Sequence, residues 1–227
     1  MRKKVRAAPT IVYPESDGKP MAETDKHRDL MIDFIQMLKQ YFENENDVYV
    51  SGNLFLYYEE GNPKKVISPD VFVVFGVEKK LRRTFQTWAE ANTPDFVLEV
   101  ASPKTFKNDM EHKKDLYASM LAVKEYYIYD PLGQIVPSFV GYRLIDGEYQ
   151  EIDFVHDRLP SKTLGLELGE HDGKLRLYNP NTLQWLRTPP EEVKKIRARA
   201  ENAEARAENA EAELAKALAE IERLRAE

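Results

Sequence analysis

The chain has 227 residues, of which 42% are hydrophobic and 32% are charged, a composition that supports a packed core and excludes an intrinsically disordered body. It contains no cysteine, which excludes disulfides, thiolate nucleophiles and Cys-ligated zinc and fits a reducing, cytoplasmic setting. The net charge of -6 opposes tight, sequence-independent binding to a polyanion, so binding to nucleic acid would need a local basic patch.

Residues 1–20 are expected to form an N-terminal arm. The segment is basic at its start, but no apolar stretch follows, so we predict no secretory signal. No run in the chain approaches the roughly 18 consecutive apolar residues that a membrane-spanning helix needs. We therefore expect no membrane partner.

A helix is predicted to follow Thr24, whose side chain suits the N-cap position. Glu23 precedes this helix and is interpreted as an acidic residue that favours the helix N-terminus. His27 lies near the centre of the apolar face. A lone histidine in such a place is more often a core residue than a functional one, and this is the interpretation we favour. The apolar face recurs at three- and four-residue spacing, in Leu30, Met31, Phe34, Ile35, Leu38, Tyr41 and Phe42.

Four short runs rich in aromatic and β-branched residues come next, and each is predicted to be a strand. A second helix is predicted from Asp109 to about Ala122, followed by a further strand at Tyr126–Tyr129. Two Asp-Gly pairs, at 146–147 and 172–173, then predict hairpins added to this core. The order α-β-β-β-α-β indicates an α+β fold with a mixed sheet. The four runs are Val48–Val50, Leu54–Tyr58, Val66–Phe75 and Phe96–Ala101.

Composition changes at the end of the folded region, which we place at residues 21–187. From 188 to 227 the sequence is rich in alanine and charge, and apolar residues recur at alternating spacings of three and four, the pattern of a coiled coil. We predict a long helix here. It either pairs with another helix or stands as a single charged helix, and the pattern leaves both alternatives open. Pairing through alanine would bury little apolar area.

Two predicted strands each carry a carboxylate that the apolar pattern does not need. Asp70 stands at the entrance of the run Val71–Phe75, and Glu99 interrupts the run Phe96–Ala101. A buried charge is costly unless it is paired or binds a metal. A turn or a buried ion pair is the simpler explanation for these residues. The other is a Mg²⁺ site, because two carboxylates and a backbone carbonyl suffice for a cation that keeps several waters.

Lys113 falls in the middle of the apolar face of the second predicted helix. Its ammonium either reaches water while its methylenes pack on the core, or points inward to the carboxylates. In the second case it would stabilise charge on a phosphoryl oxygen or position the attacking water.

These residues resemble the Uma-type family of putative restriction endonucleases, which belongs to the PD-(D/E)XK nuclease superfamily. The similarity rests on Pro69-Asp70, on the segment from Glu99 through Ser102 to Thr105, on Asp109 with Lys113, on Leu116-Tyr117 and on the stretch 125–131. It implies a restriction-endonuclease-like core of α-β-β-β-α-β. It also implies Asp70 and Glu99 as catalytic metal ligands, with the Val100 carbonyl as a third.

The superfamily pattern places a lysine two residues after the second acid, where this chain has Ala101. The resemblance implies that Lys113 takes over this catalytic role. It also includes Ser102, His27 and an extra acidic residue at the position of Glu23, all of which we treat as auxiliary.

The sequence therefore predicts a Mg²⁺-dependent endonuclease, with Mn²⁺ as a substitute, that hydrolyses DNA. The basic run Lys79–Arg83, with Lys64 and Lys65 before it, is the best candidate for phosphate contacts, although charge runs are usually solvated loops. We expect a homodimer through the body or the C-terminal helix. The alternative is a non-catalytic, nuclease-like scaffold that assembles through its coiled coil, favoured by Ala101 and the acidic net charge.

Overall fold

The structure is a computed structural model that describes residues 11–16, 18 and 24–226. Most of the expected N-terminal arm, and the candidate residue Glu23, lie outside these described residues. The chain divides into two compact units, one that ends at Leu186 and one that begins at Arg187. We describe each unit by itself.

The first unit begins with helix α1 (Asp25–Tyr41), which is capped as expected because the Thr24 hydroxyl accepts a hydrogen bond from the His27 backbone. Its other helical segments are α2 (Thr87–Glu90), α3 (Phe106–Asn108), the π-helical turn η1 (Asp109–Lys113) and α4 (Lys114–Ser119). The strands are β1 (Val48–Ser51), β2 (Leu56–Tyr57), β3 (Val66–Ile67), β4 (Val71–Phe75), β5 (Phe85–Gln86), β6 (Phe96–Val100), β7 (Glu125–Tyr129), β8 (Phe139–Ile145), β9 (Glu148–Glu151), β10 (Arg158–Ser161), β11 (Leu166–His171), β12 (Lys174–Asn179) and β13 (Gln184–Trp185).

The main sheet has six strands in the order β1-β4-β6-β7-β8-β9. It is mixed, because β6 and β7 run parallel while the other neighbours are antiparallel. The helix α1, the strands β1, β4 and β6, the helical segment α3–α4 and the strand β7 follow one another in the predicted order. The run predicted at 54–58 forms the short strand β2, the run predicted at 66–75 divides into β3 and β4, and β5 is an additional short strand. The α+β class and the α-β-β-β-α-β order are confirmed.

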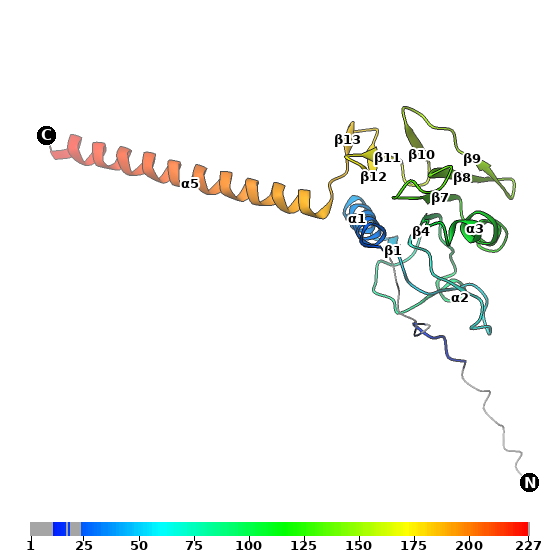
Figure 1. The fold of residues 1–227 in the computed structure, drawn as a ribbon. Coiled ribbons are helices and arrows are strands. Elements are labelled where there is room, and N and C mark those ends of the chain that lie inside the picture. The colour runs from blue at the N-terminus through cyan, green and yellow to red at the C-terminus, as the bar shows by residue number, and fades with distance from the viewer. Residues whose placement is uncertain (1–10, 17, 19–23, 227) are drawn as a thin grey trace, which may run out of the picture. The chain divides into compact units, whose positions relative to one another are not determined.

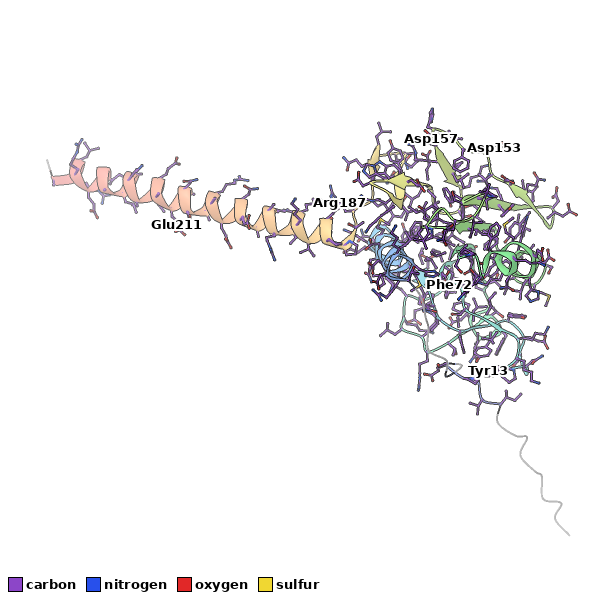
Figure 2. The ribbon with its side chains drawn as sticks, viewed as in Figure 1. Tyr13, Phe72, Asp153, Asp157, Arg187 and Glu211 are labelled. Atoms are coloured by element: carbon purple, nitrogen blue, oxygen red, sulfur yellow. The ribbon has the colours of Figure 1, made fainter. Side chains whose placement is uncertain are left out.

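Both faces of this sheet are covered by helices (Figure 1), which explains why its central strands are apolar without alternation. On one face, Phe34 and Leu38 of α1 pack against Val71 and Leu98. On the other face, Tyr117 of α4 packs with Phe72 and with the other strand side chains that point to the same side of the sheet. Figure 2 shows Phe72 among the densely packed side chains of this unit.

Both predicted hairpins are present. Ile145 pairs with Glu148 across the first Asp-Gly turn, and His171 pairs with Lys174 across the second. In each turn the Asp and the Gly both have a positive φ, between 51° and 85°, which is the backbone conformation that tight hairpins require. The second hairpin belongs to an additional four-stranded sheet, β10-β11-β12-β13.

The second predicted helix differs from the structure in its bounds and in its winding. Helical backbone begins at Phe106 and ends at Ser119, and a π-helical turn separates α3 from α4. Met120, which the predicted helix includes, lies beyond the end of α4 and is exposed. π-turns inside helices occur often at functional sites because they change the direction of the side chains that follow.

The second unit is the helix α5 (Pro189–Ala226), which covers most of the predicted C-terminal helix. Glu192 on its first turn forms an ion pair with Arg187. None of the helices within the described residues is long and apolar enough to span a membrane.

Candidate active site

The two predicted acidic residues lie at facing positions on neighbouring strands. Val71 of β4 pairs with Leu98 of β6 in an antiparallel register, so Asp70, one residue earlier, stands opposite Glu99, one residue later. Directly opposed residues of an antiparallel pair point to the same face of the sheet. The structure therefore brings Asp70 and Glu99 together on the face that α4 covers.

The ammonium of Lys113 points inward to this pair. It lies 2.9 Å from Glu99 Oε2 and 2.9 Å from Asp109 Oδ1, one turn earlier on η1. The Glu99 side chain is 1% exposed and the Lys113 side chain 19%, so the lysine covers the glutamate and reaches the surface with part of its length. Of the two alternatives for Lys113, the structure shows the inward one.

A second contact to Glu99 comes from α4. The Tyr117 hydroxyl donates a hydrogen bond of 2.6 Å to Glu99 Oε1, and this tyrosine is fully buried. Burial raises the pKa of Glu99 to about 8, and the nearby carboxylates of Asp70 and Asp109 act in the same direction, while Lys113 opposes them. The pKa of Lys113 is raised despite burial, because two carboxylates favour its charged form.

His27 lies beside Asp70 rather than in the core. Its Nε2 is 3.5 Å from Asp70 Oδ2, and both side chains are 15% exposed. The same carboxylate oxygen accepts a hydrogen bond of 2.8 Å from the Val100 backbone. Burial alone would raise the pKa of Asp70, but the contacts with His27, Lys113 and Val100 outweigh it and lower this pKa. His27 is thus partly buried and borders the cavity beside Asp70, because Asp70, which directly precedes β4, meets the first turn of α1.

His27, Asp70, Val100, Asp109 and Lys113 border one cavity of about 460 Å³, whereas Glu99 lies behind Lys113 and is not one of its lining residues. Ser102 lines it too, but this residue also shapes its own loop, because its backbone donates to the Thr105 hydroxyl. The remaining wall comes from the loop after β7, where the Asp130 carboxylate accepts backbone hydrogen bonds from Leu132, Gln134 and Ile135. The lining residues are Thr24, His27, Asp70, Val100, Ala101, Ser102, Pro103, Lys104, Thr105, Asp109, Lys113, Pro131, Leu132 and Gln134.

The donors at this cavity and directly behind it suit a hard divalent cation. Among the described residues, no group of three or more His, Cys, Asp or Glu side chains is placed to hold a metal ion. Glu99 Oε2 and Asp109 Oδ1 are buried and face Lys113, but accept no regular hydrogen bond within the described part of the chain. Mg²⁺ is typically bound through one or two carboxylates with several waters retained, so Asp70 and Glu99, with the carbonyl of Val100, fit this cation in kind.

Much of the predicted basic patch serves the structure of the body. Arg82 is 3% exposed, pairs with Glu90 through two contacts of 2.8 Å and stacks on the Tyr49 ring. Lys79 donates to the Phe42 carbonyl at the end of α1. These two residues have internal partners, which argues against a phosphate-binding role for them.

Sequence reasoning gave no site role to two residues that touch the predicted ones. Asp109 entered only as part of the family resemblance and as the first residue of a helix. Its position four residues before Lys113 is the signal that indicates a pair on one helix face. Tyr117 belongs to the family resemblance and to the apolar face of the predicted helix, and nothing in its spacing distinguishes a tyrosine that donates to Glu99 from one that only packs.

Comparison with known proteins identifies the family. A family model named Uma2 and described as "Putative restriction endonuclease" matches residues 8–175, which is well over half of the chain. The chain belongs to the Uma2 family. Membership confirms the resemblance found in the sequence and indicates a nuclease of the restriction-endonuclease type with the corresponding fold.

One solved structure similar to the chain is described as a putative nuclease belonging to DUF820 from Anabaena variabilis ATCC 29413. The two chains are 17% identical, with a TM-score of 0.47 over 66% of this chain and 81% of that chain. No curated protein matches the chain.

Proposed function

We propose that this Uma2 protein is a metal-dependent endonuclease that hydrolyses DNA phosphodiester bonds. One observation carries the proposal: Asp70 and Glu99 face each other on adjacent strands, and the Lys113 ammonium lies 2.9 Å from Glu99 beside an open cavity. Two acids and one lysine of this kind are the side chains that metal-assisted phosphodiester hydrolysis uses, and the family description agrees with that chemistry.

The two acids would hold Mg²⁺, or Mn²⁺ in its place, together with the Val100 carbonyl. When bound, the cation lowers the pKa of a coordinated water and neutralises charge on the phosphoryl oxygens. Asp70 is prepared for this role, because its lowered pKa keeps it ionised at neutral pH. Glu99 must lose its proton on binding the cation, and the hydrogen bond from Tyr117 favours that ionised form.

Lys113 would act on the substrate side of the acids. Its side chain borders the cavity, and its raised pKa keeps it protonated. An ammonium held at a fixed place stabilises negative charge that develops on a phosphoryl oxygen, and it also orients an attacking water. In this chain the lysine is supplied by η1, because the position two residues after Glu99 is Ala101.

Asp109 holds the Lys113 ammonium in the position from which it would stabilise charge or orient the water. It pairs with Lys113 on η1 and is 1% exposed. We describe it as a positioning residue, since it acts through Lys113.

A plasmid-nicking assay tests the proposal. Purified protein with Mg²⁺ or Mn²⁺ is expected to convert supercoiled DNA to the nicked form. Asp70→Asn and Glu99→Gln should each abolish nicking and weaken Mn²⁺ binding in calorimetry. Glu111→Gln is the matched control, because Glu111 is an exposed acid on the same π-turn as Lys113 and does not line the cavity.

Two outcomes would overturn the proposal. Equal nicking by the wild type and both acid variants would show that the activity comes from elsewhere. Absence of both Mn²⁺ binding and nicking in the wild type would favour the non-catalytic alternative.

A further inference from the structure

An exposed apolar seam runs the length of α5. Ten positions, alternately three and four residues apart, hold only Val, Ile, Leu or Ala. The large side chains among them, Val193, Ile196, Leu214, Ile221 and Leu224, are 45–60% exposed. The other five seam residues are Ala200, Ala203, Ala207, Ala210 and Ala217.

We propose that α5 pairs with α5 of a second copy of this chain in a parallel, in-register, two-stranded coiled coil. The unbroken alternation of three and four residues is the heptad pattern that brings two helices together along one seam. The helix has 38 residues and is therefore about 57 Å long, enough for more than four heptads.

The charged residues on either side of the seam favour pairing with a second copy of α5 in the parallel direction. In a parallel pair, the last residue of one heptad, at position g, faces the e residue of the following heptad on the partner helix. Arg199 then faces Glu204 of the partner helix, and Arg206 faces Glu211. Glu192 likewise faces Arg197. Each of these contacts is attractive, and each occurs twice because the pair is symmetric.

Other arrangements of the same two helices lose this match. A shift by one heptad would bring Glu192 against Glu204, Arg199 against Arg197 and Glu213 against Glu211.

A fully overlapped antiparallel pair keeps the attraction between Arg206 and Glu213. It also places Arg197 against Arg225 and Glu211 against its own copy. Like charges at these positions select against a register, so the parallel, in-register pair is the one that the sequence favours.

The apolar residues divide the seam into three parts. Val193 and Ile196 lie in the first turns, alanines fill the middle, and Leu214, Ile221 and Leu224 lie towards the end. Alanine lets two helices approach closely but buries little area, so most of the apolar burial is at the two ends. In a monomer the large apolar side chains of the seam stay exposed to water, whereas pairing covers them.

Parallel pairing has a consequence for the nuclease-type body. The body directly precedes α5 in each chain, so both bodies would be attached at the same end of the coiled coil. An antiparallel pair would attach them at opposite ends. This inference does not depend on nuclease activity, because it rests on α5 alone.

Single cysteines in the full-length chain test direction and register, because the native sequence has no cysteine. Ala200→Cys and Ala217→Cys place the thiol on the seam, where a parallel, in-register pair brings equivalent Cα atoms to roughly the 5.5–6 Å that a disulfide favours. Each variant alone should form a disulfide-linked dimer on mild oxidation. Ala219→Cys is the matched control, since this alanine lies on the opposite side of the helix and should remain monomeric on a non-reducing gel.

The alternatives give different results. Linkage only in a mixture of Ala200→Cys and Ala217→Cys, and in neither alone, would show antiparallel pairing and overturn the proposal. Equal linkage of Ala217→Cys and Ala219→Cys would show random collision, and no linkage together with a monomeric mass would show a single helix. Both results would also overturn it.

A charge reversal gives an independent test by sedimentation. Arg206 has no charged residue three or four positions away on its own helix, so Arg206→Glu changes contacts between helices rather than within one. The dimer dissociation constant should rise on the order of tenfold in Arg206→Glu. The added change Glu211→Arg should restore it. An unchanged dissociation constant in Arg206→Glu would contradict the proposed register.

Discussion

Lys113 reaches from a π-helical turn to a buried strand residue, so that its ammonium lies 2.9 Å from Glu99 Oε2. The first prediction concerns this contact. Lys113→Met should reduce nicking by at least about 100-fold, because a fixed positive charge beside a developing oxyanion contributes on that scale. The rate of plasmid nicking at saturating Mg²⁺ measures it. Lys113→Arg keeps the charge and should retain more activity than Lys113→Met. The reverse order would mean that Lys113 only packs.

Asp109→Asn should lower the nicking rate less than the loss of the lysine does, by about tenfold, because the Lys113–Glu99 contact remains when the Asp109 charge is removed. Single-turnover rates at saturating DNA measure the effect on the chemical step. Glu111→Gln is the control, because Glu111 is exposed on the same turn, and this variant should behave as wild type. A loss as large as that of Lys113→Met would instead make Asp109 a direct participant.

Tyr117→Phe should weaken metal binding while leaving the fold intact. The Tyr117 hydroxyl donates to Glu99 Oε1, and removal of a partner behind a metal ligand typically costs about 10- to 100-fold in metal affinity. Mn²⁺ calorimetry measures this affinity. Tyr126→Phe is the matched control, because the neighbouring Tyr126 hydroxyl donates to the Asp109 backbone carbonyl instead. Equal losses in the two variants would point to a general packing effect.

Part of the position of the two acids could be predicted from the sequence, because side chains alternate along a strand and the family resemblance pairs Asp70 with Glu99. The antiparallel register of β4 and β6, which places both acids on the same face, comes from the structure. Helical periodicity places Lys113 on the apolar face but leaves open whether its ammonium reaches water or the carboxylates, and the contact with Glu99 shows the second.

Other features depend on tertiary contacts that a pattern does not contain. The apolar face around His27 suggested a core residue, but the approach of Asp70 to α1 decides its environment. The π-turn at 109–113 has no Gly or Pro to mark it. The run Lys79–Arg83 is visibly basic in the sequence. The sequence does not reveal that Arg82 contacts the Tyr49 ring and the Glu90 carboxylate.

Glu90→Gln tests this structural role of Arg82 through the pH dependence of stability. Hydrogen bonds from Arg82 lower the pKa of Glu90 below its usual 4.5 in the folded protein. The unfolded chain therefore binds the proton more readily, and the pair stabilises the fold above about pH 4.5 and loses this contribution as pH falls through the lowered pKa. At pH 7, Glu90→Gln should be less stable by about 1–3 kcal/mol, because Arg82 is left buried without its charged partner.

Urea unfolding of wild type and Glu90→Gln at several pH values measures this difference, which should shrink as the pH falls below about 4.5. DNA affinity at neutral pH is the second readout. It should be unchanged in Glu90→Gln, since Arg82 is 3% exposed and engaged within the body. Unchanged stability with altered DNA affinity would instead place Arg82 at the DNA, because only a residue free to reach phosphates would respond in that way.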